Sequence, residues 1–131
     1  MLSPDQKRIV EKYKETYQKI GKIICPYFLG EFIYFNRKGF NHILRKGNKG
    51  RSFSDQIERL ELLKYCEKIL TAKHERVEYR ITRKGSKIGR FWGFYDNFEN
   101  FKIMIVVLQI NQGNKHFFSI YKTLNTPRGG V

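Results

Sequence analysis

The stretch FKIMIVVLQI, residues 101–110, decides the fold, because it is an almost unbroken run of apolar and β-branched residues. Such a run is typical of a central β-strand that is covered on both faces. It is also far shorter than the roughly 20 residues that a helix needs to cross a bilayer. The sequence therefore predicts a buried sheet strand here and no membrane-spanning segment.

Three more strands are predicted around this one, with turn residues between them. Residues 75–84 alternate between apolar and polar side chains, and residues 88–95 are rich in aromatic side chains. A short turn then leads from the central strand into residues 115–122, which read KHFFSIYK. Consecutive strands joined by short turns favour an antiparallel meander.

The N-terminal half is predicted to be mainly helical. The sequence Ser3-Pro4-Asp5-Gln6 has the pattern of a capping box, and helical spacing of apolar residues continues to a stop at Gly21. Residues 31–36 are interpreted as a strand and residues 39–46 as a short helix. A second capped helix is expected from Ser52 or Ser54 to near Ala72.

This order of elements predicts the fold class and the domain organisation. Helices followed by antiparallel strands indicate an α+β fold, with N-terminal helices packed on one face of a roughly four-stranded antiparallel β-sheet. A chain of 131 residues fits a single domain, 1–131. Within it we expect an N-terminal helix at 1–22, a core at 31–123 and a flexible tail at 124–131.

The charge of the chain is strongly unbalanced. Lys and Arg total 26 against 12 for Asp and Glu, which gives a net charge of +14. Residues 32–54 and 100–131 contain no Asp or Glu, and most acids lie in the two longer predicted helices. This separation predicts one cationic front that binds a polyanion, and the aromatic residues beside it favour RNA. The alternative is a solvated lysine-rich surface of the kind that AT-rich genomes encode.

The side chains expected to contact RNA combine these cations with one strand aromatic. They are Arg37, Arg45, Lys46, Arg51, Arg90, Trp92, Lys115 and Lys122.

Several classes of protein are excluded by missing patterns. Cys25 and Cys66 have no CxxC spacing and are interpreted as free thiols of a reducing cytosol. No cluster of Cys and His has zinc spacing, and no phosphate-binding glycine motif is present, so we expect neither a metal nor a cofactor. The N-terminus lacks the apolar core of a signal peptide, which predicts a cytoplasmic protein.

Two histidines are the main candidates for acid–base chemistry. His42 lies in GFNHILRK, where a helix would put Arg45 and Lys46 on the same face as His42. These cations would lower the pKa of His42, which suits a general base. A capping or core-edge histidine is the alternative. His116 begins the last strand just after a turn, where its side chain can reach the mouth of a cleft.

The last strand also carries a polar residue in an apolar setting. Strict alternation puts His116, Phe118, Ile120 and Lys122 on one face and Ser119 on the other. Ser119 therefore needs a partner or a ligand, and the alternative is a hydroxyl bonded to a neighbouring backbone group.

Metal-free RNA cleavage needs a base, an acid and cations for the developing phosphorane charge. Candidate proton carriers are His42, His116 and Glu78. Candidate charge stabilisers are Arg45, Lys46, Arg80 and Lys122.

The helix motif at residues 39–45, the long capped helix, the meander and the final KHFFS strand resemble the barnase–EndoU–colicin–RelE-like nuclease superfamily of phages and polymorphic toxins. The resemblance covers roughly residues 31–123 and leaves the N-terminal helix outside it. It implies a helical layer on a four-stranded antiparallel sheet and RNA cleavage without a metal. It also implies that His42 is the helix histidine of the family, that His116 and Ser119 are its terminal-strand polar residues, and that Arg80 is its strand arginine.

The leading hypothesis is a metal-independent endoribonuclease, in the class of toxins or mobile-element effectors, that acts on an RNA such as tRNA or mRNA. Its expected protein partner is an antitoxin or immunity protein, and no membrane is expected to take part. Two alternatives stay open: a non-catalytic nucleic-acid-binding protein on the same scaffold, and a small interaction protein with an acidic partner. An enzyme requires His42 and His116 to share one cleft, whereas a binder requires only a continuous basic surface.

Overall fold

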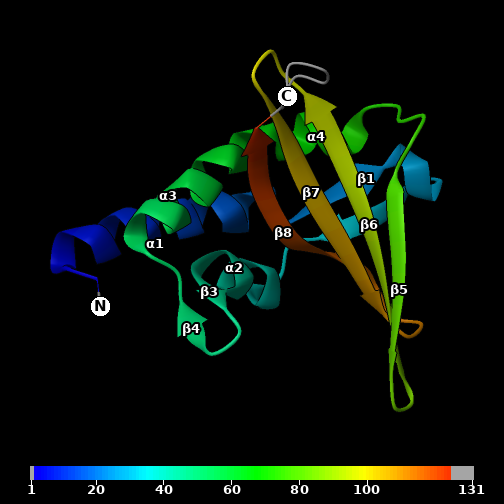
Figure 1. The fold of residues 1–131 in the computed structure, drawn as a ribbon, viewed down its shortest axis with the longest axis horizontal. Helices are drawn as coiled ribbons and strands as arrows, with labels where there is room; N and C mark the ends of the chain where they lie inside the picture. Colours follow the sequence, from blue (N-terminus) through cyan, green and yellow to red (C-terminus); the bar gives the residue numbers. More distant parts are fainter. Residues whose placement is uncertain (1, 125–131) are drawn as a thin grey trace, which may run out of the picture.

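The structure is a computed structural model that describes residues 2–124, and it has the expected α+β architecture (Figure 1). The helices are α1 (Pro4–Ile20), α2 (Arg37–Leu44), α3 (Phe53–Glu61) and α4 (Cys66–Thr71), with short 3₁₀ turns at Pro26–Phe28 and Leu62–Tyr65. The strands are β1 (Lys22–Cys25), β2 (Glu31–Tyr34), β3 (Arg45–Lys46), β4 (Lys49–Gly50), β5 (Glu78–Lys84), β6 (Lys87–Asn97), β7 (Phe101–Ile110) and β8 (Lys115–Leu124).

The main sheet is larger than the sequence predicted. It has six strands in the order β1-β2-β8-β7-β6-β5, whereas roughly four were expected. The meander from β5 to β8 is antiparallel throughout, as predicted. The β1–β2 hairpin joins it through a short parallel pairing in which Ile33 and Tyr34 lie opposite Lys115 and His116. That contact connects segments far apart in the chain, so the local pattern contained no sign of it.

The helical segments begin and end where local chemistry allows. The predicted capping box is present, because Ser3 Oγ accepts from the Gln6 backbone N–H and the Gln6 side chain accepts from the Ser3 N–H. The helix expected up to Ala72 is interrupted at Leu62–Tyr65, where a tighter turn buries two adjacent leucines, Leu62 and Leu63. Helix α2 begins two residues earlier than expected, since the Asn36 side chain caps it through the Gly39 N–H.

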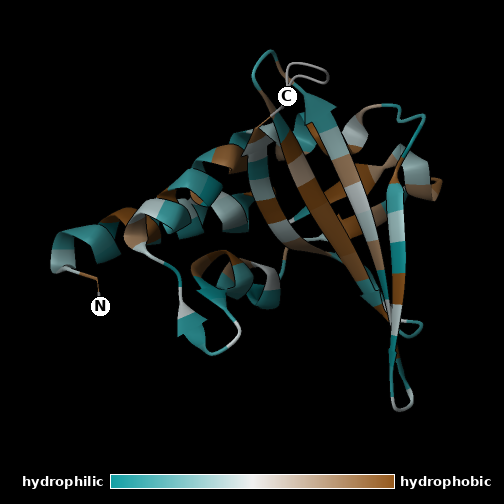
Figure 2. Cartoon of the chain, in the orientation of Figure 1, coloured by the Kyte–Doolittle hydropathy of each residue, from teal (hydrophilic) through white to brown (hydrophobic). Residues whose placement is uncertain are grey.

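The core lies on one face of the sheet, between the strands and the helices. Phe94, Ile105 and Phe117 are fully buried there, and the apolar stripe along β7 is visible in Figure 2. Helix α2 approaches β8 so closely that a Cβ on Gly39 would lie 2.5 Å from the Phe117 carbonyl oxygen. Glycine at this position therefore lets α2 reach the edge of β8.

A β-bulge in β8 corrects the predicted faces of this strand. Val107 pairs with Phe117 and Val106 pairs with Ser119, so Phe118 is an extra residue between them. The bulge resets the alternation. As a result, Ser119 lies on the same face as His116, and Lys122 lies on the opposite face, the reverse of the prediction.

The C-terminal tail expected at 124–131 falls almost entirely outside the described residues. Leu124 is the last residue of β8. Among the residues that the structure describes, no helix combines the length and the apolar character needed to cross a membrane.

Candidate active site on the open face of the sheet

The face of the sheet opposite the core, which we call the open face, is exposed at β5, whereas Met104 and Leu108 on β7 are only 4% and 3% exposed. Three register rows cross it from β8 to β5. One row contains His116, Leu108, Phe91 and Arg80; the next contains Ser119, Val106, Gly93 and Glu78; the third contains Tyr121, Met104 and Tyr95. Helices α2 and α3 pack beside β8 and bring further side chains to this face (Figure 1).

Helix α2 brings His42 against the bulge. The centroid of its imidazole lies 4.2 Å from that of the Phe118 ring. Its backbone carbonyl accepts a hydrogen bond from Arg51 Nε at 3.2 Å. His42 Nδ1 is buried and has no hydrogen-bond partner among residues 2–124. A ligand or water must therefore satisfy that nitrogen, or it stays desolvated at a cost.

The surroundings of His42 favour its neutral form. Burial is the largest cause that lowers its pKa, followed by the positive charges of Arg51, Arg59 and Lys46. The pKa of His42 is thus lowered, as predicted, but the two cations that lower it most, Arg51 and Arg59, lie outside the helix that carries His42. Arg45, which was expected to contribute, instead donates to the Asn48 carbonyl oxygen at 2.7 Å. A neutral imidazole near pH 7 can accept a proton.

Two arginines share one carboxylate beside His42. Asp55 Oδ2 lies 3.4 Å from Arg51 Nη1, and Asp55 Oδ1 lies 3.1 Å from Arg59 Nε. The arginine side chains are only 9% and 17% exposed, respectively, so most of their surface is removed from water. One carboxylate neutralises one of two guanidinium charges, and the surplus positive charge makes this cluster suited to an anion.

Arg59 also connects the helix to β8. Its Nη1 donates to the Ile120 carbonyl oxygen at 3.0 Å and to Ser119 Oγ at 3.5 Å. Its guanidinium carbon lies 5.9 Å from the Tyr121 ring centroid. Arg59, Ser119 and Tyr121 therefore form a single polar group next to the bulge. Both sequence interpretations of Ser119 involved a partner, and the structure shows that this partner is an arginine side chain.

An aromatic path joins this group to the far side of the face. The rings of Phe118 and Phe91 have centroids 5.5 Å apart, and the Arg80 guanidinium lies 4.7 Å from the Phe91 centroid. These two rings meet edge to face, and partly exposed rings beside a guanidinium can serve as a platform for unstacked bases. The open face thus runs from His42 on α2 to Arg80 on β5.

His116 is on the same face as Ser119 but is only 8% exposed. Burial is the largest influence on the pKa of His116 and lowers it; a hydrogen bond with the Asn114 backbone opposes this shift, and the charge of Lys38 adds to it. Its Nε2 is buried and has no hydrogen-bond partner within the described chain. The imidazoles of His42 and His116 flank the bulge without contacting one another in residues 2–124. A buried, neutral His116 is better placed to support the bulge than to donate a proton, so an enzyme at this site would need its acid from another side chain and not from the expected pair of His42 and His116.

Several residues predicted to bind RNA lie away from this cluster. Trp92, Arg90 and Lys115 occupy the other face of the sheet. Lys115 is 11% exposed and pairs with Glu31 at 2.9 Å, and Trp92 packs against Phe28. Lys122 pairs with Glu58 at 3.6 Å on that same side.

The remaining predicted cations and the predicted acid are exposed. Arg37 lies in the first turn of α2, and Lys46 lies in the small β3–β4 ribbon. Glu78 is on the open face, but on β5, three strands from β8. At about 4.8 Å per strand, this places Glu78 roughly 14 Å from the strand that carries Ser119.

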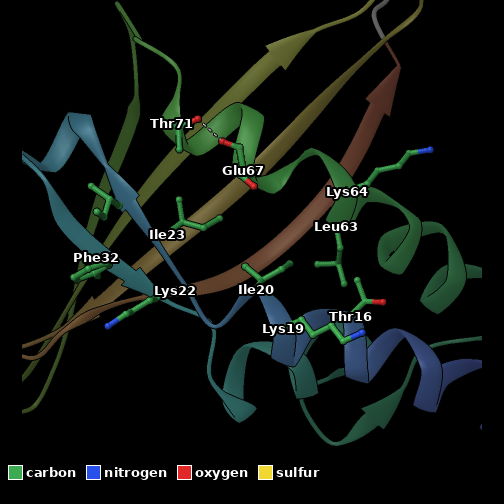
Figure 3. A pocket seen from close by; sticks show the side chains of 11 residues that line it. Thr16, Lys19, Ile20, Lys22, Ile23, Phe32, Leu63, Lys64, Glu67 and Thr71 are labelled. Atoms are coloured by element: carbon green, nitrogen blue, oxygen red, sulfur yellow. Dashed lines mark hydrogen bonds between the residues drawn. The ribbon is translucent and has the colours of Figure 1, made fainter.

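Another hollow lies away from this face and has a different character (Figure 3). It is a groove of about 620 Å³ between the end of α1, the edge strand β1 and α4. Ile20, Ile23 and Leu63 line it, with lysines at the rim. Within residues 2–124 its lining contains neither histidine nor arginine, so it lacks the combination of imidazole and guanidinium groups that lies beside the β8 bulge.

Sequence reasoning missed Arg59, Tyr121 and the role of Phe118. Arg59 follows Asp55 by four residues, the spacing of a helical ion pair, and this was the only local signal for it. The contact of Arg59 with Ser119 spans 60 positions of sequence, and nothing local predicts it. Phe118 and Tyr121 depend on the bulge, which alternation cannot reveal.

Among residues 2–124, no group of three or more His, Cys, Asp or Glu side chains is arranged to hold a metal ion. Comparisons of the chain with family models, curated proteins and solved structures found no match.

Proposed function

We propose that this protein is a metal-independent endoribonuclease whose active site is the open face of the sheet beside the β8 bulge. The observation that carries the proposal is the position of His42 next to the Arg51–Asp55–Arg59 cluster. It places a neutral imidazole beside surplus positive charge, and both belong to a cationic protein of net charge +14. Metal-free cleavage of RNA needs such a pair.

In the proposed reaction, the imidazole of His42 takes the proton of a ribose 2′-hydroxyl. The 2′-oxygen then attacks the neighbouring phosphorus, and the bond from phosphorus to the 5′-oxygen breaks. Arg59 and Ser119 stabilise the negative charge that develops on the phosphorane oxygens. The Tyr121 hydroxyl gives its proton to the leaving 5′-oxygen and regains one from His42 through water. The products are a 2′,3′-cyclic phosphate and a 5′-hydroxyl.

Charge complementarity extends the proposal to a protein partner. An unrestrained ribonuclease would damage the RNA of the cell that makes it. Residues 45–50, which form the β3–β4 ribbon and carry only basic charges, flank the proposed site. An acidic inhibitor, of the antitoxin or immunity class, would be attracted to this surface and would compete with RNA for it.

The test is incubation of the purified protein with mixed-sequence single-stranded RNA in the presence of EDTA, followed by analysis of the cut ends. Cleavage that leaves 2′,3′-cyclic phosphates is expected. His42→Asn should reduce the rate at least about 100-fold, because it removes the base. His74→Asn is the matched control, since His74 contacts Phe94 on the core face.

Two outcomes would contradict the proposal. Intact RNA in the presence of a folded wild-type protein would do so, and binding without cleavage would then favour the non-catalytic alternative. Equal rates for His42→Asn and His74→Asn would remove His42 from the mechanism.

A further inference from the structure

The groove between the end of α1, the edge strand β1 and α4 has the features of a docking site for a protein segment (Figure 3). We propose that an extended, acidic segment of a partner protein binds there and pairs with β1 as a seventh strand of the main sheet. Both α1 and β1 precede residue 31, so they lie outside the part of the chain that resembles the nucleases. The proposal does not depend on the proposed cleavage of RNA.

Strand β1 lies at an edge of the sheet and pairs with β2 on one side only. The Phe35 N–H donates to the Gly21 carbonyl oxygen at 2.8 Å, which makes these two residues a hydrogen-bonded pair of the hairpin. Such pairs alternate along an antiparallel ladder, so Ile23 directs its backbone groups at β2. Lys22 and Ile24 therefore direct their N–H and carbonyl groups away from β2, where an added strand would bind.

The groove beside this edge accepts apolar side chains. It has a volume of about 620 Å³, and Ile20 of α1, Ile23 of β1 and Leu63 of the second 3₁₀ turn converge on it (Figure 3). Adjacent strands lie about 4.8 Å apart and their side chains alternate between faces. A strand added to β1 would therefore place every second side chain over the groove, and a segment of alternating apolar and polar residues would fit.

Exposed apolar side chains gather at the same end of the sheet. Ile24 is 53% exposed, Tyr27 is 44% exposed and Leu29 is 97% exposed. All three lie in residues 24–29, which include the second half of β1 and the turn after it. Exposed apolar side chains that lie close together mark interaction surfaces.

The charges around the groove favour an acidic occupant. Its lining contains Lys19, Lys22 and Lys64 but only one acid, Glu67. Within residues 2–124, none of these lysines forms an ion pair, and Lys22 Nζ instead lies 4.3 Å from the centroid of the Phe32 ring. The surplus positive charge would attract carboxylates and repel a basic segment.

The same charges argue against two other occupants. Two copies of this chain that pair through β1 about a twofold axis would bring each set of groove lysines toward the other. Residues 125–131, which lie outside the described part of the chain, contain Arg128 and no acid. A separate acidic chain therefore complements the groove better than a second copy or the C-terminal residues do.

The first experiment is an NMR titration with two capped octapeptides. One alternates glutamate and valine, and the matched peptide has lysine in place of each glutamate. The glutamate peptide should shift the amide resonances of Lys22 and Ile24 and slow their hydrogen exchange, because these amides would gain partners. The lysine peptide should bind at least about tenfold more weakly.

The second experiment tests the backbone pairing. Ile24→Pro removes the outward N–H, and proline is tolerated on an edge strand where the N–H faces solvent. This variant should bind the glutamate peptide at least about tenfold more weakly. The matched control is Ile24→Thr, which keeps the N–H and the preference for a strand, and its affinity should stay within about threefold of the wild type.

The third experiment tests the charges and needs no change in β1. Lys19→Glu combined with Lys64→Glu should weaken binding of the glutamate peptide about tenfold. The matched control combines Lys7→Glu with Lys12→Glu, which makes the same change in net charge at exposed positions of α1 outside the groove. The control should bind within about twofold of the wild type.

Three results would overturn the proposal. The first is that neither peptide binds at millimolar concentration, or that both bind equally. The second is that Ile24→Pro, in folded protein, leaves binding unchanged. The third is a concentration-dependent dimer that Ile24→Pro abolishes, which would assign this edge to a second copy of the chain. RNA cleavage enters none of these measurements, so failure of the ribonuclease proposal would leave the docking site standing.

Discussion

The two faces of the sheet use the same strands for different purposes. On the core face, Ile105, Phe117 and Ile120 are completely buried against the helices. On the open face, the neighbouring residues of β8 include Ser119 and Tyr121, which meet Arg59. Alternation along a strand makes this division possible, and the bulge at Phe118 adjusts it by one residue. The fully buried aromatic and aliphatic side chains of β7 and β8 thus lie on the core face, whereas the proposed chemistry lies on the open face, where Met104 and Leu108 are also buried.

The largest effect is expected from a substitution on the core face. Phe94→Ala should lower the free energy of unfolding by about 3–5 kcal/mol, because Phe94 is fully buried and its removal leaves a cavity. Val106→Ala, at a half-buried position on the open face, should cost about 1 kcal/mol or less. Urea unfolding measures both values. Equal losses of unfolding free energy in the two variants would mean that packing on the open face stabilises the fold as much as packing on the core face.

The fold itself could be predicted in large part from the sequence. The capping box at Ser3 and the strand at residues 101–110 depend on local patterns, and both are present. The β1–β2 hairpin joins β8 through only a few residues, and Pro26 and Gly30 interrupt the pattern before it. Pairings between distant short segments have no periodic signature, so the sheet was expected to be smaller than it is.

A smaller effect is expected where the open face meets the helices. Arg59→Gln should reduce RNA cleavage about 100-fold, because it removes a donor to the developing phosphorane charge. Lys122→Gln is the matched control, since Lys122 pairs with Glu58 on the other side and should leave cleavage within about twofold.

The effect of Arg59 substitutions on stability can be measured separately from their effect on the cleavage rate. Arg59 also holds the Ile120 carbonyl, so its loss should cost about 1–3 kcal/mol of stability. Arg59→Lys keeps the charge but loses the planar fork, and its rate should fall between those of the wild type and Arg59→Gln. Equal rates for Arg59→Gln and Lys122→Gln, both in folded protein, would contradict the proposed role.

The smallest expected effect concerns pH. Burial and nearby cations lower the pKa of His42 below its usual 6.5, so the base stays available into mildly acidic solution. The kcat/KM for RNA should therefore fall about tenfold per pH unit only below a midpoint that is lower than 6.5. A pH–rate profile measures this midpoint, and a value at or above 6.5 would contradict the environment described for His42.

The lowered pKa values of His42 and His116 also determine how the stability of the fold changes with pH. The folded protein favours neutral His42 and His116, whereas the unfolded chain gains protons near pH 6.5. Their contribution to folding is present above that pH and is lost as the pH falls through the lower folded values. Unfolding measured at pH 7 and pH 5 should show this loss.

The candidate site was harder to predict than the fold. His42 could be proposed because its neighbours in a short helix are basic, yet the cations that affect it most are Arg51 and Arg59. The prediction that Ser119 and His116 lie on opposite faces was wrong, because one extra residue in β8 reverses the alternation. Local patterns thus identify residue types, but tertiary contacts decide which of them meet.

One feature of β5 affects how copies of this protein behave together. This strand lies at the edge of the sheet, and all of its residues are exposed, so its outer backbone groups face solvent. A bare edge of this kind is a template on which a second sheet can grow. Arg80, Arg83 and Lys84 place like charges along it, and two copies that approach edge to edge would repel one another. The cations of β5 therefore disfavour edge-to-edge pairing of two copies, an effect that does not depend on any ligand.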